Sequence, residues 1–413
     1  MKTTDAFTRG ENLIEAIISK MPDIDKWQKN FMLHIFVLCL GMKGRFNFLQ
    51  MEREGIYNEQ SYRNNYKKDF DFLGFNQALI NKNCSKNLIL GFDPSFIEKS
   101  GKCTSGLGYF YSGVAKSYKK GLEIGGLAVV DIDQKTAYHL ECIQTPSAKK
   151  NNLNENKTLV DHYTELIVER APKLLNTSDL LVVDGYFAKQ KFINGVTEQT
   201  SLRIVCRLRD DANLCYLYKG PKLKRRGRPR KHDGKVDTNN IDKRRIKFCH
   251  SDEQKTIYST ILFSKSLKRN IKVSYVEFLN KNSEIVAKKF FFSTDIEMTG
   301  LDIFTYYSSR FQMEFLFRDS KQFCGLQHCQ ARDAKKLDFH FNTCLTAVSI
   351  GKVLLRQGTK KTEKKILSIF NITIEFQNRN FMKRIFLNSG IDPNIINIRK
   401  NIKKLLDFGK IAA

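Results

Sequence analysis

Three acidic residues occupy positions at which a sheet-based metal site would need them. Asp93 follows a short buried strand predicted at residues 88–92, and Asp184 follows a second one at residues 180–183. Glu314 lies within a predicted helix. Ligands bind α/β sheets at the carboxyl ends of the strands. Carboxylate oxygens gathered there suit Mg²⁺, for which Mn²⁺ can substitute, and two such ions could clamp the attacking and leaving oxygens of a displacement at phosphorus.

A polar stripe runs along the predicted helix from Thr299 through Lys321. Tyr307, Arg310, Glu314 and Lys321 follow one another at steps of three, four and seven, which places all four on one helix face. A solvated stripe with a weak Arg310–Glu314 pair is the ordinary alternative. Four apolar side chains crowd the rest of the helix, so we expect the stripe to face a ligand, with Arg310 and Lys321 holding phosphates on either side of a metal-bound Glu314; they are Phe311, Met313, Phe315 and Phe317.

The elements around these residues predict a ribonuclease-H-like, or retroviral-integrase-like, α/β core. We expect Pro94 to end the first strand. Two further strands form an antiparallel meander, and a helix, a strand, a helix and a strand follow. Their predicted bounds are Glu123–Val130, Thr136–Ile143, Leu159–Ala171, Leu180–Val183, Phe187–Gly195 and Leu202–Leu208. Four other aspartates, Asp131, Asp133, Asp210 and Asp211, fit turns better than a shared metal site.

The pattern along the chain divides it into five regions. A helical region with a basic face comes first, and a DNA-binding module or an ordinary helical cap would both account for it. The α/β core follows in two parts, separated by a β-rich insertion, and a basic helical region ends the chain. The predicted bounds are 1–86 for the N-terminal region, 87–211 and 284–357 for the core, 212–283 for the insertion and 358–413 for the C-terminal region.

The composition predicts a polyanion as partner. Lysine and arginine outnumber the acids by 70 to 43, for a net charge of +27, which suits DNA, RNA or an anionic membrane.

No apolar run approaches the ~20 residues of a membrane span, and no secretory signal is evident, so we expect a cytoplasmic, nucleoid-associated protein. The glycines form no phosphate-cradling loop, which excludes a nucleotide cofactor. Cys324, His328 and Cys329 could supply three zinc ligands, but a fourth is not evident.

The densest basic run lies inside the predicted insertion, at residues 222–231. It contains Arg226-Gly-Arg228-Pro and then Arg230. This matches the core of an AT-hook, whose extended arginines fit a narrow minor groove. A flexible solvated loop is the alternative, and nonspecific phosphate contact by Arg226, Arg228 and Arg230 is the simpler expectation.

The helix stripe resembles a known family signature. Tyr307, Arg310, Glu314 and Lys321 reproduce the Y-x2-R-x3-E-x6-K pattern of the group-four bacterial insertion-sequence transposases, members of the DDE class. The segment from Asp93 to Gly101 is similar to the family's first-aspartate block, with Ser95 where threonine is commoner. Asp184-Gly-Tyr-Phe is similar to the second. The resemblance covers residues 87–350 well and the two ends only loosely.

The resemblance implies a Mg²⁺-dependent DNA endonuclease and strand-transfer enzyme. Asp93, Asp184 and Glu314 would be its catalytic metal ligands, while Tyr307, Arg310 and Lys321 would contact DNA. It implies cut-and-paste movement of an insertion sequence by a homodimer bound to the terminal inverted repeats and target DNA. Some relatives form a DNA hairpin and stack a flipped base on a tryptophan in the insertion. Here the single tryptophan, Trp27, lies near the N-terminus, so Phe248 or Tyr258 would have to take that role.

Two other functions stay open on the sequence. The chain could be a catalytically silent, transposase-derived DNA-binding regulator, although its complete set of acids argues against this. It could also be a stand-alone nuclease of ribonuclease-H-like fold that cuts without joining strands. Inverted repeats flanking the coding DNA would separate the transposase from both.

Overall fold

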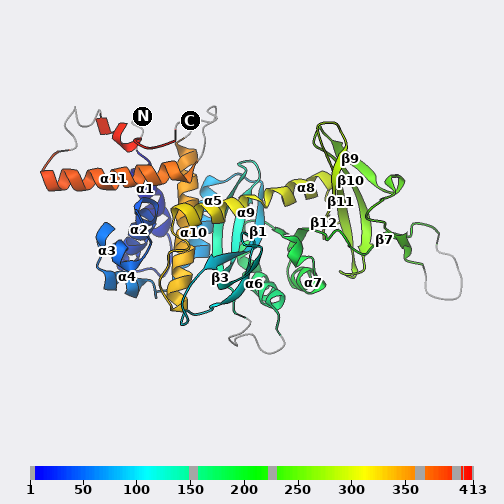
Figure 1. The fold of residues 1–413 in the computed structure, drawn as a ribbon, viewed down its shortest axis with the longest axis horizontal. Coiled ribbons are helices and arrows are strands. Elements are labelled where there is room, and N and C mark those ends of the chain that lie inside the picture. The colour runs from blue at the N-terminus through cyan, green and yellow to red at the C-terminus, as the bar shows by residue number, and fades with distance from the viewer. Residues whose placement is uncertain are drawn as a thin grey trace.

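The computed structural model describes residues 5–147, 157–221, 230–358, 368–392, 401–402 and 404–411. The molecule is elongated, with helices from both ends of the chain at one end, a sheet in the middle and a group of long strands at the other end (Figure 1). This arrangement confirms the mixed α/β class, with helical regions at both chain ends and a large sheet between them.

Helices fill the chain between residues 5 and 87. Each begins after an Asp or Asn whose side-chain oxygen accepts a hydrogen bond from the backbone N–H three residues later, a cap that the local sequence encodes. They are α1 (Ala6–Ile18), α2 (Lys26–Gly41), α3 (Phe48–Glu54), α4 (Glu59–Asn65) and α5 (Phe72–Asn83). The middle and end of α2 are buried among α1, α10 (Ala334–Gln357) and α11 (Ile369–Ser389).

The central part of the sheet is built around β1 (Leu88–Glu98). On one side it pairs antiparallel with β3, and on the other it pairs parallel with β5. The order across this part is β2-β3-β1-β5-β6-β12, with β4 also paired to β3. These strands are β2 (Gly108–Ser112), β3 (Ser117–Asp131), β4 (Thr136–Gln144), β5 (Leu180–Val183), β6 (Arg203–Arg207) and β12 (Ile285–Ser293).

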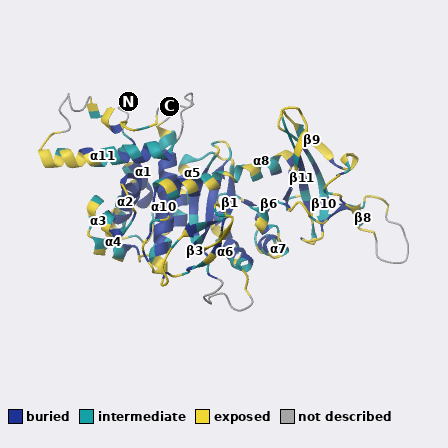
Figure 2. Ribbon diagram, in the orientation of Figure 1, coloured by how far each residue is buried: buried dark blue, intermediate teal, exposed yellow. Residues whose placement is uncertain are grey.

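Helices cover both faces of this central part. The crossover helices α6 (Leu159–Leu174) and α7 (Gln190–Gln199) connect β4 to β5 and β5 to β6. Tyr163 of α6 packs on the face at Gly125, and Phe317 of α9 (Gln312–Phe323) packs on the opposite face at Gly126. Helix α10 is buried along almost all of its length (Figure 2). The core therefore lies between the helices and β1, β3, β4 and β5.

The prediction that Pro94 ends the first strand was wrong, because β1 continues to Glu98. The partner strand β5 pairs only with residues 90–92 of β1, whereas β3 pairs with β1 over its whole length. Beyond Phe92 one side of β1 therefore carries no partner strand, and a proline is tolerated at such an edge. Asp93 consequently lies inside β1 rather than after it.

The strands beyond β12 extend the same sheet away from the helices (Figure 1). They are β7 (Leu214–Leu217), β8 (His232–Lys235), β9 (Lys247–Ser251), β10 (Lys255–Ser264) and β11 (Arg269–Leu279), with a short 3₁₀ turn, η2 (Lys243–Arg245), before β9. Another 3₁₀ turn, η1 (Gly185–Phe187), follows β5 in the central part of the sheet. β12 pairs with β11 along most of its length but with β6 only through residues 291–293. The end of β12 is thus the junction between the two groups of strands.

The single helix predicted from Thr299 to Lys321 was also wrong, since two helices occupy this segment. They are α8 (Gly300–Ser309) and α9, and they meet at Arg310 and Phe311. Backbone hydrogen bonds of the tighter i to i+3 type run through this junction, from the N–H groups of Arg310, Phe311, Met313 and Glu314. The tighter winding turns α9 so that Met313 and Phe317 face the sheet.

Gly91 of β1 permits α9 to approach closely. A Cβ atom at Gly91 would lie 2.4 Å from Sδ of Met313. We expect Gly91→Ala to lower the free energy of unfolding by about 1–3 kcal/mol, because overpacking forces α9 away from the sheet. Urea unfolding measures the change, with Gly113→Ala as control, since nothing lies within 4 Å of a Cβ there. Equal stability of the two variants would contradict this packing.

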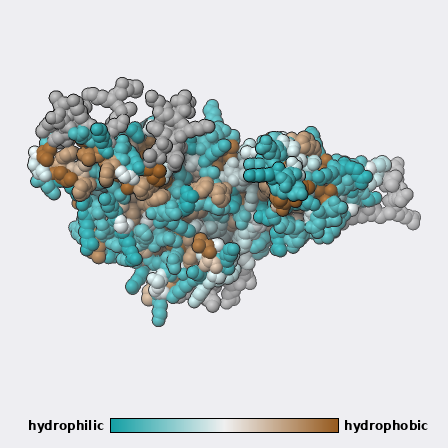
Figure 3. All heavy atoms as spheres, turned by 45° about the horizontal axis from the view of Figure 1, so that its top comes forward, coloured by the Kyte–Doolittle hydropathy of each residue, from teal (hydrophilic) through white to brown (hydrophobic). Residues whose placement is uncertain are grey.

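Hydrophilic residues predominate on the face drawn in Figure 3, with apolar side chains in scattered patches. In the portion of the chain that the structure describes, none of the helices combines the length and apolar character of a membrane span.

Candidate active site

Asp93 and Asp184 lie side by side because of the register between two parallel strands. Phe92 of β1 pairs with Val183 of β5, so each aspartate is the residue that follows a paired position. The backbone carbonyl of Asp184 accepts hydrogen bonds from the N–H of Phe187 and from Sγ of Cys206, which hold the turn after β5. Parallel pairing thus brings together two aspartates that the sequence separates widely.

Glu314 reaches the same sheet edge from the first turn of α9. Met313 packs against Gly91 and Phe317 against Gly126, so the apolar side of the helix lies on the sheet. Glu314 follows Met313 and lies at the rim, with 46% of its side chain exposed. The apolar packing of α9 therefore positions a carboxylate beside Asp93.

The Arg310 side chain connects these acids. Its Nη1 donates to Oδ2 of Asp93 at 3.1 Å, and its Nη2 donates to Oε1 of Glu314 at 3.2 Å. The hydroxyl of Tyr307 donates to Oδ1 of Asp184 at 3.2 Å. The Arg310 guanidinium also lies over the ring of Tyr307, at 5.9 Å from its centroid, and this contact joins the two sets of hydrogen bonds. Five of the six residues singled out around the predicted site thus form one group, which we call the acidic cluster: Asp93, Asp184, Tyr307, Arg310 and Glu314.

Lys321 lies further along the same helix. Its ammonium group donates to the backbone carbonyl oxygen of Phe96 in β1 at 2.9 Å, and burial lowers its pKa. The contact joins the last turn of α9 to the strand that carries Asp93. In this arrangement Lys321 secures α9 to the sheet edge.

Burial and crowding of like charges alter the protonation of the acidic cluster. Burial raises the pKa of Asp93 to about 7; Arg310 opposes this shift, while Asp184 and Glu314 add to it. Burial acts to lower the pKa of the Arg310 guanidinium, but the surrounding acids, Asp93 first, leave it above its ordinary value. Burial, and then Asp184, raise the pKa of Tyr307. Arg310 is therefore the cation that allows the carboxylates to lie together.

The donor set is chemically suited to a hard cation. Three carboxylates supply the oxygen ligands that Mg²⁺ and Mn²⁺ prefer. Asp93 is largely buried, and the neighbouring negative charges of Asp184 and Glu314 favour a cation beside it. Among the described residues, however, no three His, Cys, Asp or Glu side chains converge closely enough to hold an ion. The guanidinium of Arg310 lies between Asp93 and Glu314 and supplies the compensating positive charge.

Of the three arginines of the predicted basic run, the structure describes only Arg230, which lies apart from the acidic cluster. Arg226 and Arg228 fall outside the described residues. Arg230 precedes β8, where it forms an ion pair with Asp233 and lies over the ring of Tyr218. Strands β7 and β8 occupy the end of the molecule remote from α9 (Figure 1). The structure therefore does not bring Arg230 to the acids.

Other residues considered from the sequence have local roles. Asp131 accepts hydrogen bonds from the N–H groups of Ser85 and Gln134, and Asp210 pairs with Lys289, so these acids stabilise turns as expected. Burial raises the pKa values of Cys324 and Cys329, which behave as core thiols. The exposed ring of Phe248 on β9 packs edge-on against Tyr258 on β10 at 6.0 Å.

The sequence did not reveal the residues that hold α9 and the turn after β5 in place. Gly91 and Gly126 allow α9 to lie against β1 and β3, and Cys206 supports the turn at Asp184. The available signal was a glycine inside each buried strand, which often marks a close approach of another element. Nothing local to Cys206 indicates its contact.

These features define a class of protein. A mixed α/β sheet carries two aspartates on neighbouring parallel strands, with a glutamate on a helix beside them. Residues 92–350 match the family model described as Transposase DDE domain, and the chain belongs to this family. No curated protein matches the chain. Family membership supports a transposase role and an enzyme that acts on DNA, and the family generally uses divalent metal ions.

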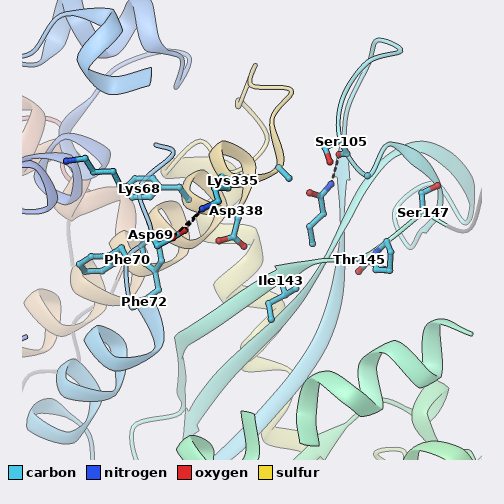
Figure 4. A pocket seen from close by; sticks show the side chains of 15 residues that line it. Lys68, Asp69, Phe70, Phe72, Ser105, Ile143, Thr145, Ser147, Lys335 and Asp338 are labelled. Atoms are coloured by element: carbon cyan, nitrogen blue, oxygen red, sulfur yellow. Dashed lines mark hydrogen bonds and ion pairs between the residues drawn. The ribbon is translucent and has the colours of Figure 1, made fainter. Parts of the chain in front are cut away.

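A pocket of about 450 Å³ lies away from the acidic cluster (Figure 4). Three phenylalanines, Lys68 and Lys335 line it together with Asp338 of α10; the phenylalanines are Phe70, Phe72 and Phe339. Lys335 pairs with Asp69 across the mouth. Burial raises the pKa of Asp338 to about 7, and the neighbouring Glu141 adds to the shift. Asp338 is therefore protonated in the folded chain at mildly acidic pH.

Asp338 gives a pH dependence to stability. Its folded pKa lies above its unfolded value, so the folded state binds the extra proton, and the resulting stability is present at low pH and lost as pH rises through about 7. We expect the stability of Asp338→Asn relative to wild type to be greater near pH 8 than near pH 5 by roughly 2–3 kcal/mol. Urea unfolding at both pH values measures this. The exposed Glu253→Gln control should keep the wild-type dependence, and an unchanged Asp338→Asn profile would contradict the assignment.

Proposed function

We propose that the protein is a transposase that moves a bacterial insertion sequence by cutting DNA at the ends of the element and joining those ends to target DNA. The observation that carries this proposal is the acidic cluster, in which Asp93, Asp184 and Glu314 meet at one sheet edge within a transposase DDE domain. The sheet order β4-β3-β1-β5-β6, with helices between β4, β5 and β6, supports a ribonuclease-H-like core.

Asp93, Asp184 and Glu314 would hold Mg²⁺, or Mn²⁺ in its place. When bound, such ions activate the attacking oxygen and neutralise charge that develops on the phosphate and the leaving oxygen. The helix α9 positions Glu314, and the pairing of β1 with β5 positions the two aspartates. The same site would serve both steps. Water would first cleave the phosphodiester bond at the element end and leave a 3′-hydroxyl and a 5′-phosphate. The 3′-hydroxyl would then attack a phosphodiester of the target DNA, forming the new bond as the target's own 3′-hydroxyl leaves.

Arg310 and Tyr307 organise the acids and are placed to contact the substrate. The Arg310 fork donates to Asp93 and Glu314, and the same donors match phosphate oxygens in geometry and charge. Tyr307 donates to Asp184 and holds that side chain in one orientation. Lys321 fastens α9 to β1 and adds positive charge near the site. All three residues would thus align the scissile phosphate with the carboxylates.

The remaining regions would bind the ends of the element. We assign end recognition to residues 1–86, catalysis to 87–211 and 284–357, and further DNA contacts to 212–283 and to the basic region 358–413. Within 212–283, Arg226, Arg228 and Arg230 would contact DNA phosphates, and the exposed Phe248 beside Tyr258 is suited to stack a base. Two copies of the chain would pair the two ends, and no nucleotide cofactor is required.

Incubation of the purified protein with labelled DNA from the ends of its own element tests the proposal. Nicks at the element ends that require Mg²⁺ or Mn²⁺, disappear with a chelator, and are followed by joining to target DNA would support it. End binding without cleavage under any divalent ion would identify a regulator instead. Cleavage that ignores the end sequence and never joins strands would identify a nuclease.

A further inference from the structure

A protein hairpin formed by β2 and the start of β3 presents a row of exposed tyrosines, which we call the tyrosine face: Tyr109, Tyr111 and Tyr118. Their exposed fractions are 63%, 53% and 73%, whereas the intervening Phe110 is only 4% exposed. Tyr111 pairs with Tyr118 across the two strands, and their rings meet edge to face at 5.7 Å. Since side chains alternate along a strand, the three tyrosines share one side of the hairpin and Phe110 takes the other.

Lysines are frequent in the segment that carries the tyrosine face. Residues 99–122 contain five lysines and no aspartate or glutamate. Lys120 lies directly opposite Tyr109 in the strand register, and Lys116 occupies the turn between the strands. The five are Lys99, Lys102, Lys116, Lys119 and Lys120. The hairpin therefore offers flat aromatic surface within a field that attracts an anion.

The tyrosine face is connected to the acidic cluster through β3. β3 begins at the hairpin and pairs with Asp93 through Gly126. Tyr186 follows Asp184 by two residues, is 46% exposed, and carries Lys189 3.9 Å above its ring. The strand β3 thus joins the hairpin to Asp93, and an exposed aromatic ring with a lysine above it lies beside Asp184.

The chemistry of this surface favours nucleic acid over protein. Protein interfaces are also rich in tyrosine, but they are depleted of lysine, and here the segment that carries the rings contains five lysines and no acid, with Lys120 opposite Tyr109. Base-stacking surfaces combine exposed aromatic rings with a basic groove. In duplex DNA the faces of the bases are already stacked on one another, whereas unpaired bases leave theirs available.

We propose that the tyrosine face binds unpaired nucleotides of the DNA strand that leaves the acidic cluster, by stacking bases on Tyr111 and Tyr118 while the lysines contact phosphates. This inference rests on the proposed function, because it assumes that DNA occupies the acidic cluster. It adds a binding surface outside the catalytic residues and outside the basic run of the insertion.

Fluorescence anisotropy with a labelled single strand of about 12 nucleotides, in the presence of chelator, tests the proposal without any cleavage. The variant Tyr111→Ser/Tyr118→Ser should bind the single strand at least about tenfold more weakly than wild type. The matched variant Tyr111→Phe/Tyr118→Phe keeps both rings and should stay within about threefold. Binding of a duplex of the same sequence should change little in either. Both tyrosines are exposed, so thermal unfolding midpoints should match wild type.

Wild-type affinity of the serine variant for the single strand would overturn the inference, as would an equal loss in the phenylalanine variant. Sedimentation supplies a further test: self-association of the wild type that disappears in the serine variant would assign the tyrosine face to a second copy of the chain. The binding assay contains chelator and therefore does not depend on cleavage. A failure of cleavage in a separate assay would count against the proposed function but would not change the result of the binding assay.

Discussion

Replacement of Glu314 by glutamine is expected to lower DNA cleavage by roughly 10³-fold or more, while DNA binding stays close to that of the wild type. Glutamine keeps the shape of glutamate but removes the negative charge that a metal ligand needs, and the loss of several kcal/mol at the transition state corresponds to a factor of this size. Cleavage and binding of labelled DNA are measured separately on the same preparation.

The position of Glu314 makes this substitution a clean test. Its side chain is 46% exposed, and its ion pair with Arg310 lies at the surface, so we expect a change in stability below about 1 kcal/mol. Glu297→Gln is the matched control, because it neutralises an exposed carboxylate just before α8. If Glu314→Gln loses binding and cleavage together, the residue has a structural role and the catalytic assignment fails.

Replacement of Arg310 by methionine should lower the free energy of unfolding by roughly 2–4 kcal/mol near pH 8, because it leaves the largely buried carboxylate of Asp93 without its cation. Near pH 5 the loss should be smaller. Asp93 has a folded pKa of about 7, so it is already protonated there and needs no compensating charge. Urea unfolding measures the loss in the free energy of unfolding at each pH. The variant should lose DNA cleavage at both pH values.

A double substitution separates this electrostatic effect from simple packing. In Asp93→Asn/Arg310→Met the buried charge is gone together with its partner, so the double variant should be more stable near pH 8 than Arg310→Met alone. Loss of packing around Arg310 alone would instead make the double variant the less stable of the two. The comparison therefore measures the coupling between Asp93 and Arg310 directly.

Much of the acidic cluster could be predicted because its members carry local signals. Asp93 and Asp184 accompany short runs of buried apolar residues, and Glu314 belongs to a spaced polar stripe; in the structure, Arg310 and Tyr307 join all three acids into one group. The starts of the N-terminal helices are local as well, since each Asp or Asn cap bonds a backbone group three residues away.

The predictions that proved wrong used rules about neighbouring residues, and contacts between distant parts of the chain overrode those rules. Pro94 would end a strand with partners on both sides, but β5 stops at Val183 and leaves that side of β1 open. Helical spacing between Thr299 and Lys321 gave no sign of the tight turn at Arg310. The hairpin of β2 was missed because β2 has only five residues, and Phe110 is its single buried apolar side chain, which is too short an apolar face to signal a strand.

The sequence by itself determined the chemistry that the chain can offer: which side chains carry charge, which short segments become strands or helices, and where many of the helices begin. These properties depend on residues a few positions apart, so they can be recognised without a structure. Only the tertiary structure decided that Phe92 pairs with Val183, that Met313 lies on Gly91, and that Arg310 reaches Asp93 across 217 positions. Such contacts depend on how separate elements pack and which register they adopt, and no spacing within a single element encodes that choice.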